Sequence, residues 1–411
     1  MKNGASRGPA WALDGGRRVV VALCCLLPGL SAGCGDEAAA PLRTVSDSAG
    51  VRVVTYGAGW ADAVPAWELA PEPTWEIGAV DGAEAYLFTR LTGIVPTDAG
   101  VIVADLQSRQ IREFDGQGRW VRSVGRRGAG PGEFVNLDFM GRMAGDTLVV
   151  WDGGQWRLSY LAPDLSFGRS ERWDFNNRVR GVYGVFPDGS LLKPARPSDD
   201  AGSRPRGVVT RSDMAFVSVH GSFIEEDTLA VVPGRPVFLA SDGQSVLVPF
   251  AVFPGSTVSG DAAWLGSGHT GVFARVVPGT GRTVEVRLPA SGAPVSAADF
   301  DAYKRDYLVD TDEDRRPAVR RRLDELPAPE RFPVFDVLRP GHEGQVWMRS
   351  YPLPGDSAVD WFAFTPDGEA IGRVTLPVSL AVQMVHENRL IATTRDELGV
   401  VRVVEYMLQE G

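Results

Sequence analysis

Residues 91–125 read LTGIVPTDAGVIVADLQSRQIREFDGQGRWVRSVG, in which short runs rich in Val, Ile, Phe and Trp alternate with turn residues. The turns contain Asp98-Ala99-Gly100 and Asp115-Gly116. Hairpin turns favour these residue types, because Gly adopts a positive φ freely and Asp tolerates it. The stretch therefore predicts four antiparallel strands joined by tight turns.

The same pattern recurs along the chain. Leu148–Asp152 repeats Val101–Asp105 about 47 residues later, a spacing typical of propeller blades. After each copy an apolar residue follows at the same distance, Ile111 in the first and Leu158 in the second. Four-stranded units bury both faces by packing around a ring. A β-sandwich is the alternative, but it explains one repeated four-strand pattern less readily.

We therefore predict an all-β fold, a six-bladed β-propeller of four-stranded antiparallel blades over residues 49–411, with seven blades as the alternative. The blades are expected near residues 90–125, 136–172, 181–220, 232–288, 332–376 and 379–409. The last blade has too few strands of its own. An open ring leaves sheet edges exposed, so Val51–Val54 or Trp67–Leu69 is expected to close it.

A small helical insertion is predicted over about 296–326, between the fourth and fifth blades. Ser296 and Asp299 have the spacing of a capping box, and Pro317 suits the first turn of a second helix. Connections between blades share one face of a propeller with the loops that follow each second strand. The insertion is therefore expected on the face that carries Asp105 and Asp152.

The first 33 residues are interpreted as a signal peptide. Basic residues precede Val19–Leu30, an apolar stretch of about twelve residues that is too short to span a membrane. The run Leu30-Ser31-Ala32-Gly33-Cys34 resembles the bacterial lipobox, although Leu is commoner than Ser at position 31. The resemblance implies a diacylglycerol on Cys34 and cleavage before it, and an ordinary secretory peptide cut nearby is the alternative. Residues 34–48 are predicted to form a flexible tether.

A second resemblance concerns the run GRRGAGPGEF at residues 125–134. It looks like the signature between blades of NHL-type repeats, and the rest of the chain resembles, more loosely, six-bladed propeller lipoproteins of bacterial surfaces. These resemblances imply an exported, lipid-anchored propeller. Gly35, rather than Asp, follows Cys34, which by analogy with lipobox families favours the outer membrane, facing the periplasm or the surface.

Composition limits the partners. All three cysteines lie at or before Cys34, so the predicted mature chain has no disulfide. Without its first 33 residues the chain carries a net charge of about −13. Nucleic-acid binders show the opposite balance. Membrane attachment is expected to depend on the lipid anchor alone, and we expect a monomer.

Few residues suggest catalysis. The four histidines show no metal-binding spacing, and His342 and His386 are expected to be solvated turn residues. Asp105, Asp152 and Asn136 could offer oxygen ligands to Ca²⁺, but an Asp at the end of a strand more often caps the next turn. No nucleophile elbow or phosphate loop is found. We therefore predict no catalytic residue, no metal ligand and no cofactor.

The expected function is a binding or scaffolding module for a protein, peptide or glycan. Trp and Arg commonly anchor interfaces, and the candidate binding face comprises Asp105, Arg109, Arg126, Arg127, Asp152 and Trp156. The alternative is a lactonase-like hydrolase or lyase with a divalent cation, such as Ca²⁺, in the channel. Three or more Asp, Glu or Asn side chains at the channel mouth would favour that alternative.

Overall fold

The computed structural model describes residues 41–173, 181–195, 205–220, 225–289 and 292–411. The signal peptide and Cys34 lie outside these residues. The described strands form six sheets, in which all paired strands are antiparallel except β2 and β21. In the described part of the chain, no helix is both long and apolar enough to cross a membrane.

Each sheet is one blade. The first contains β5 (Leu91–Thr97), β6 (Gly100–Asp105), β7 (Gln110–Asp115) and β8 (Trp120–Val124). The second contains β9 (Leu137–Arg142), β10 (Leu148–Asp152), β11 (Arg157–Leu161) and β12 (Phe167–Arg172). The third contains β13 (Gly184–Val185), β14 (Leu191–Ala195), β15 (Val209–His220), β16 (Glu225–Leu239) and β17 (Ser245–Leu247).

The remaining blades include strands from the N-terminal part. The fourth contains β18 (Gly255–Ser259), β19 (Ala262–Ser267), β20 (Val272–Val277), β21 (Gly281–Arg287), β1 (Arg43–Ser48) and β2 (Val51–Tyr56). The fifth contains β22 (Phe335–Pro340), β23 (Val346–Ser350), β24 (Ala358–Phe364) and β25 (Ala370–Pro377). The sixth contains β26 (Ala381–His386), β27 (Arg389–Arg395), β28 (Val401–Glu410), β3 (Trp67–Leu69) and β4 (Trp75–Ile77). Short 3₁₀ turns form at Trp60–Ala63, Glu84–Tyr86, Ala144–Asp146 and His342–Gly344.

The first strands of the blades stand around a common centre. Contacts join β5 to β9, β9 to β13, β13 to β18, β18 to β22 and β22 to β26. Residues of all six first strands line one central cavity. The predicted all-β, six-bladed propeller is confirmed, and six rather than seven blades is correct.

Apolar side chains join neighbouring blades. The second strands β6, β10 and β19 are buried along their whole length. Trp151 and Trp347 are 3% and 0% exposed and belong to apolar clusters, the first spanning the second and third blades and the second the fifth and sixth. Both therefore fill gaps between blades, the use that is commonest for Trp in such a ring. Because blades pack on both faces, these strands read as continuous apolar runs.

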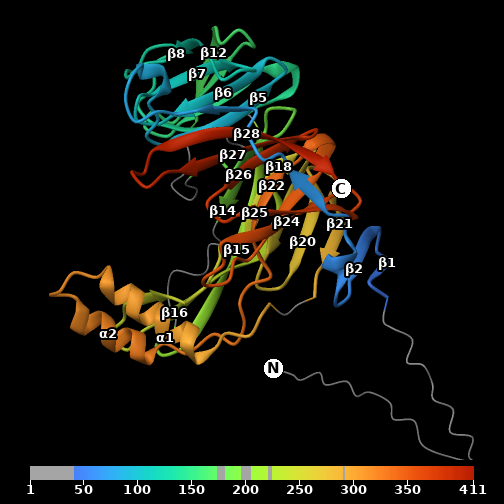
Figure 1. The fold of residues 1–411 in the computed structure, drawn as a ribbon, viewed down its shortest axis with the longest axis vertical. Helices are drawn as coiled ribbons and strands as arrows, with labels where there is room; N and C mark the ends of the chain where they lie inside the picture. Colours follow the sequence, from blue (N-terminus) through green and yellow to red (C-terminus); the bar gives the residue numbers. More distant parts are fainter. Residues whose placement is uncertain (1–40, 174–180, 196–204, 221–224, 290–291) are drawn as a thin grey trace, which may run out of the picture. The chain divides into compact units, whose positions relative to one another are not determined.

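The third blade differs from the prediction. It extends to Leu247 instead of residue 220, and the fourth begins at Gly255 instead of residue 232. Strands β15 and β16 have 12 and 15 residues, and β14 pairs only with the Ala215–Val219 part of β15. The other half of the hairpin therefore continues beyond the sheet, toward the helices (Figure 1).

The helical insertion gives this long hairpin an apolar partner. Helices α1 (Ala297–Val309) and α2 (Arg316–Glu325) form where the sequence predicts them, and the Ser296–Asp299 capping box is present. Phe300 and Leu323 pack against Phe238 of β16 in one cluster. The Oγ and backbone N of Ser241 donate to Glu325 at 2.6 and 2.7 Å. This insertion connects β21 to β22, so it lies on the face predicted for it.

The ring closes with N-terminal strands. β3 pairs with the end of β28, and β4 pairs with its middle, where Trp75 faces Glu405. Of the two strands predicted to close the ring, Trp67–Leu69 does so, as β3. The other, Val51–Val54, is part of β2, which pairs in parallel with β21 of the fourth blade. The predicted tether is also too long, because residues 43–48 form β1 against β2. Its residues 34–40 lie outside the described residues.

Candidate functional site

Two carboxylates of the predicted binding face are internal. Asp105 is 1% exposed and accepts hydrogen bonds from the backbone N–H groups of Thr89, Arg90 and Ser108 at 2.9–3.2 Å. Asp152 is 0% exposed. It accepts from four backbone N–H groups at 2.7–3.1 Å, those of Val135, Asn136, Gly154 and Gln155. Both side chains cap loops inside the protein, so they do not belong to an exposed face.

The arginines and Trp of that predicted face lie in the loops between and within the first two blades. Arg109 donates to the carbonyl oxygens of Val135 and Gln107 at 2.9 and 2.7 Å. Arg127 is exposed, and its backbone forms a bridge with Phe134. Trp156 is 41% exposed and lies edge-on to Trp151. A binding role for these residues remains a prediction.

Glu133 organises the Gly-rich loop that also carries Arg126. Its carboxylate accepts from the backbone N–H of Gly130 and from the Arg126 guanidinium, both at 2.8 Å. These donors hold the pKa of Glu133 below its usual range. A Cβ at Gly128 would lie 2.1 Å from Glu133 Oε2. A larger residue at position 128 would therefore displace the Glu133 carboxylate from these donors.

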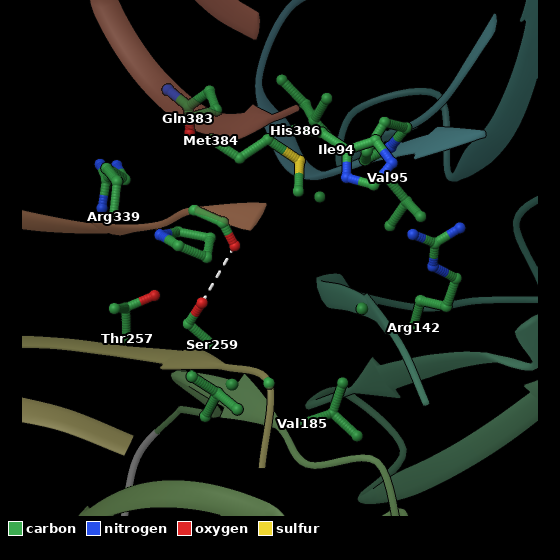
Figure 2. Close-up of a pocket in the computed structure, with 18 of the residues that line it drawn as sticks. Ile94, Val95, Arg142, Val185, Thr257, Ser259, Arg339, Gln383, Met384 and His386 are labelled. Carbon is green, nitrogen blue, oxygen red and sulfur yellow. Dashed lines mark hydrogen bonds between the residues drawn. The ribbon is translucent and has the colours of Figure 1, made fainter. Parts of the chain in front are cut away.

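The central channel contains a cavity of about 570 Å³. Figure 2 shows Ile94, Val95, Val185 and Met384 as apolar walls and Thr257, Ser259 and Gln383 as polar ones. The cavity reaches the turns that join first and second strands, at Pro187, Gly260 and Gly344 for example. This is the face opposite to the predicted one, because the loops carrying Asp105 and Asp152 follow second strands.

The channel is basic although the chain is acidic. Arg142, Arg339, His342 and His386 line the cavity, against one carboxylate, Glu343, among the described residues. A second cavity of about 490 Å³ shares Thr92, Gly93, Ile94 and Gln383 with the first. It adds Arg90 and Arg395 and no carboxylate from the described chain. This lining contains few of the oxygen ligands that the Ca²⁺-dependent alternative would need.

Arg339 is the most unusual of these groups. Its Nε donates to the carbonyl oxygen of Val382 at 2.8 Å, and in the described chain no carboxylate lies within salt-bridge distance of it. The nearby Asp336 accepts two hydrogen bonds from Arg349, at 2.9 and 2.6 Å. Burial lowers the pKa of Arg339, the positive charge of Arg349 lowers it further, and the negative charge of Asp336 opposes both. A partly buried cation without an ion-pair partner favours an anion from outside.

His342 and His386 meet at the same mouth of the channel. Their Nδ1 atoms are 3.3 Å apart, and the rings are T-shaped with centroids 5.0 Å apart. Burial, followed by the neighbouring His342, lowers the pKa of His386. Both lie at turns and are partly exposed, as predicted, but they are not isolated, because their turns belong to adjacent blades and converge. The sequence signal for this contact was their position, since each lies at the end of the first strand of its blade or directly after it.

The other two histidines have local roles. His269 Nε2 accepts from the backbone N–H of Val252 at 3.2 Å, and burial lowers its pKa to about 4. His220 is half exposed, with its Nδ1 3.6 Å from Asp188. Neither lines the channel. Among the described residues, no group of three or more His, Cys, Asp or Glu side chains is arranged to hold a metal ion.

Several solved structures are similar to this chain at low sequence identity. A protein described as exported, from Bacteroides fragilis, has 12% identity and a TM-score of 0.45, covering 86% of this chain and 99% of its own. Virginiamycin B lyase from Staphylococcus aureus has 10% identity and a TM-score of 0.38, covering 84% and 99%. The PQQ-bound aldose sugar dehydrogenase from Streptomyces coelicolor has 13% identity and a TM-score of 0.40, covering 84% and 100%.

No protein-family model and no curated protein matches the chain. At these identities a likeness concerns the fold alone. The activities in those descriptions belong to those proteins, and the function of this chain is argued below from its own residues.

Proposed function

We propose that this chain is an exported lipoprotein whose propeller binds the anionic group of a peptide or glycan in its central channel. The observation that carries the proposal is Arg339, a partly buried guanidinium in the channel wall that forms no ion pair in the described chain. Arg142 lines the same cavity. An entering carboxylate or phosphate would supply the missing negative charge, and hydrogen bonds between charged groups are about twice as strong as neutral ones.

The size of the cavity suggests the kind of occupant. About 570 Å³ lies within the range of small-ligand sites, roughly 300–1,000 Å³. A peptide end or one or two sugar residues would fill it, whereas a folded protein would contact only its rim. The apolar walls around Val95 and Met384 would pack against the body of such a ligand while the arginines hold its charge. This mixture of apolar walls and a few placed polar groups is typical of ligand pockets.

The test compares acids with matched neutral compounds. Calorimetry with the chain from residue 35 onward would use N-acetylglutamate against N-acetylglutamine, and glucuronate against glucose. We expect an acid to bind at least about tenfold more tightly than its neutral counterpart, and Arg339→Gln to weaken it by about 10- to 100-fold. Arg206→Gln, outside the channel and bonded to the Ser241 carbonyl, is the control. Equal binding of acids and neutral compounds, or an unaffected Arg339→Gln, would contradict the proposal.

The anchor is tested separately. If Cys34 carries the lipid, Cys34→Ser should move the protein from the membrane fraction to the soluble fraction of the cell envelope, because two acyl chains anchor stably and none remains in the variant. Fractionation and mass measurement of the N-terminal peptide would read out the change. Cys25→Ser is the control within the signal peptide. Equal membrane retention of wild type and Cys34→Ser would exclude the lipid anchor.

A further inference from the structure

The two histidines at the channel mouth have the separation of a metal chelate. Zn–N bonds are about 2.0–2.1 Å long, so two of them at a tetrahedral angle place the nitrogens about 3.3–3.4 Å apart. His342 Nδ1 and His386 Nδ1 are 3.3 Å apart. In the absence of a metal, one ring can donate an N–H···N hydrogen bond to the other at that distance. The rings meet edge to face instead of stacking, so the two Nδ1 atoms approach one another directly.

We propose that His342 and His386 together bind a divalent transition-metal ion, with Zn²⁺ as the representative species. The site lies in the same channel as the proposed ligand but does not depend on that ligand being anionic. Imidazole nitrogens suit Zn²⁺, Cu²⁺ and Ni²⁺, whereas Ca²⁺ and Mg²⁺ require oxygen ligands. The remaining coordination positions face the cavity and would be filled by water or by a ligand.

The surroundings hold both rings in position before any metal arrives. His342 belongs to a short 3₁₀ turn fixed by the Gln345 N–H, which donates to the His342 carbonyl oxygen at 3.0 Å. His386 is the last residue of β26 and pairs with Arg389 across a hairpin. Preorganised ligands of this kind lose little conformational freedom on binding.

Glu343 is the carboxylate next to His342. Its Oε1 lies 3.7 Å from His342 Nε2, the ring nitrogen that does not face His386, and its side chain is 81% exposed. A small movement of this exposed side chain would let it accept a hydrogen bond from Nε2–H and leave the lone pair on Nδ1. Carboxylates commonly orient metal-binding histidines in this way, through the nitrogen that is not a ligand.

Charge limits the affinity. Arg142 and Arg389 both act on His386 and oppose a further positive charge. In addition, two protein ligands hold a metal less firmly than the three or four of catalytic and structural zinc sites. We therefore expect one weak but defined site, rather than a structural metal on which folding depends.

Titration calorimetry of the chain from residue 35, with ZnCl₂ in a buffer that does not bind metals, tests the proposal. We expect one Zn²⁺ per chain in the absence of any anionic ligand, and no binding of Mg²⁺ at the same concentrations. His386→Ala and His342→Ala should each weaken binding by about tenfold or more, and the double variant should be little worse, because either loss breaks the chelate. His220→Ala, which removes a half-exposed histidine outside the channel, should bind like the wild type.

Thermal melts would show that each variant is folded, and two independent alanine variants keep the test decisive if one is not. Unchanged Zn²⁺ affinity in both variants, or an equal loss in His220→Ala, would overturn the proposal. Arg339→Gln separates the two hypotheses, because it removes the group proposed to hold the anion and leaves both imidazoles in place. Zn²⁺ binding that survives in that variant, with no acid bound by the wild type, would reject only the anionic ligand.

Discussion

Replacing Trp75 by alanine is expected to lower the free energy of unfolding by about 3–5 kcal/mol, the usual cost of truncating a buried Trp. Trp75 is 4% exposed and lies in β4, one of the two N-terminal strands that close the ring. Its ring packs in a cluster that includes Val101 of the first blade and Val403 of the sixth. The substitution would therefore leave a cavity at the seam where the ends of the chain meet.

Urea denaturation of Trp75→Ala and Trp120→Ala would measure this effect. Trp120 is in the outermost strand of the first blade and is 48% exposed, so its truncation should cost less than about 1 kcal/mol. The two variants lose the same atoms, and the comparison isolates burial. Similar losses in both would contradict the view that the seam is part of the core.

The second large effect is expected for Asp152→Ala, a loss of about 3–5 kcal/mol. The variant leaves four backbone N–H groups and the Gln155 Nε2 without the acceptor they share. A buried donor without an acceptor costs about 1–3 kcal/mol, and partial relaxation of the loop reduces the sum. The measurement is again the free energy of unfolding from urea denaturation.

Two further variants test whether the loss of stability follows the number of hydrogen bonds and the burial of the carboxylate. Asp105→Ala removes an acceptor that serves three backbone N–H groups, so it should cost less than Asp152→Ala but more than 1 kcal/mol. Asp62→Ala, at a carboxylate that is 88% exposed, should change stability by less than about 0.5 kcal/mol. If Asp152→Ala instead kept near wild-type stability and bound the ligand more weakly, Asp152 would be a binding residue, as the sequence analysis predicted.

The blades were predictable where local chemistry marks their turns. Asp115-Gly116 lies at the turn between β7 and β8, and Asp367-Gly368 lies in the turn between β24 and β25, because a tight hairpin favours such residues. The third blade escaped prediction for a tertiary reason. The end of β16 packs through Phe238 against Phe300 of α1 and Leu323 of α2, and the strand's own sequence does not indicate that partner.

The residues that line the channel were much harder to predict from the sequence than the fold. It takes a few side chains from each blade, so Arg142 and Arg339 are neighbours in function while almost 200 residues apart in sequence. Asp105 and Asp152 were included in the predicted binding face because they occupy equivalent positions in two blades. In the structure both carboxylates cap loops, so their equivalence comes from a repeated loop cap. His342 and His386 recur in the same way, at the turns of adjacent blades, and the structure brings their rings together.

The pairing of β3 with β28 joins residues about 340 positions apart, Leu69 with Leu408. Contacts between such distant positions form late, because a long loop must close before they contribute. A chain that ends before β28 keeps an unpaired blade edge and cannot complete the ring, and exposed edges invite aggregation and proteolysis. Closure of the ring thus depends on β28, and products that lack this strand would be distinguishable by their greater susceptibility to proteases.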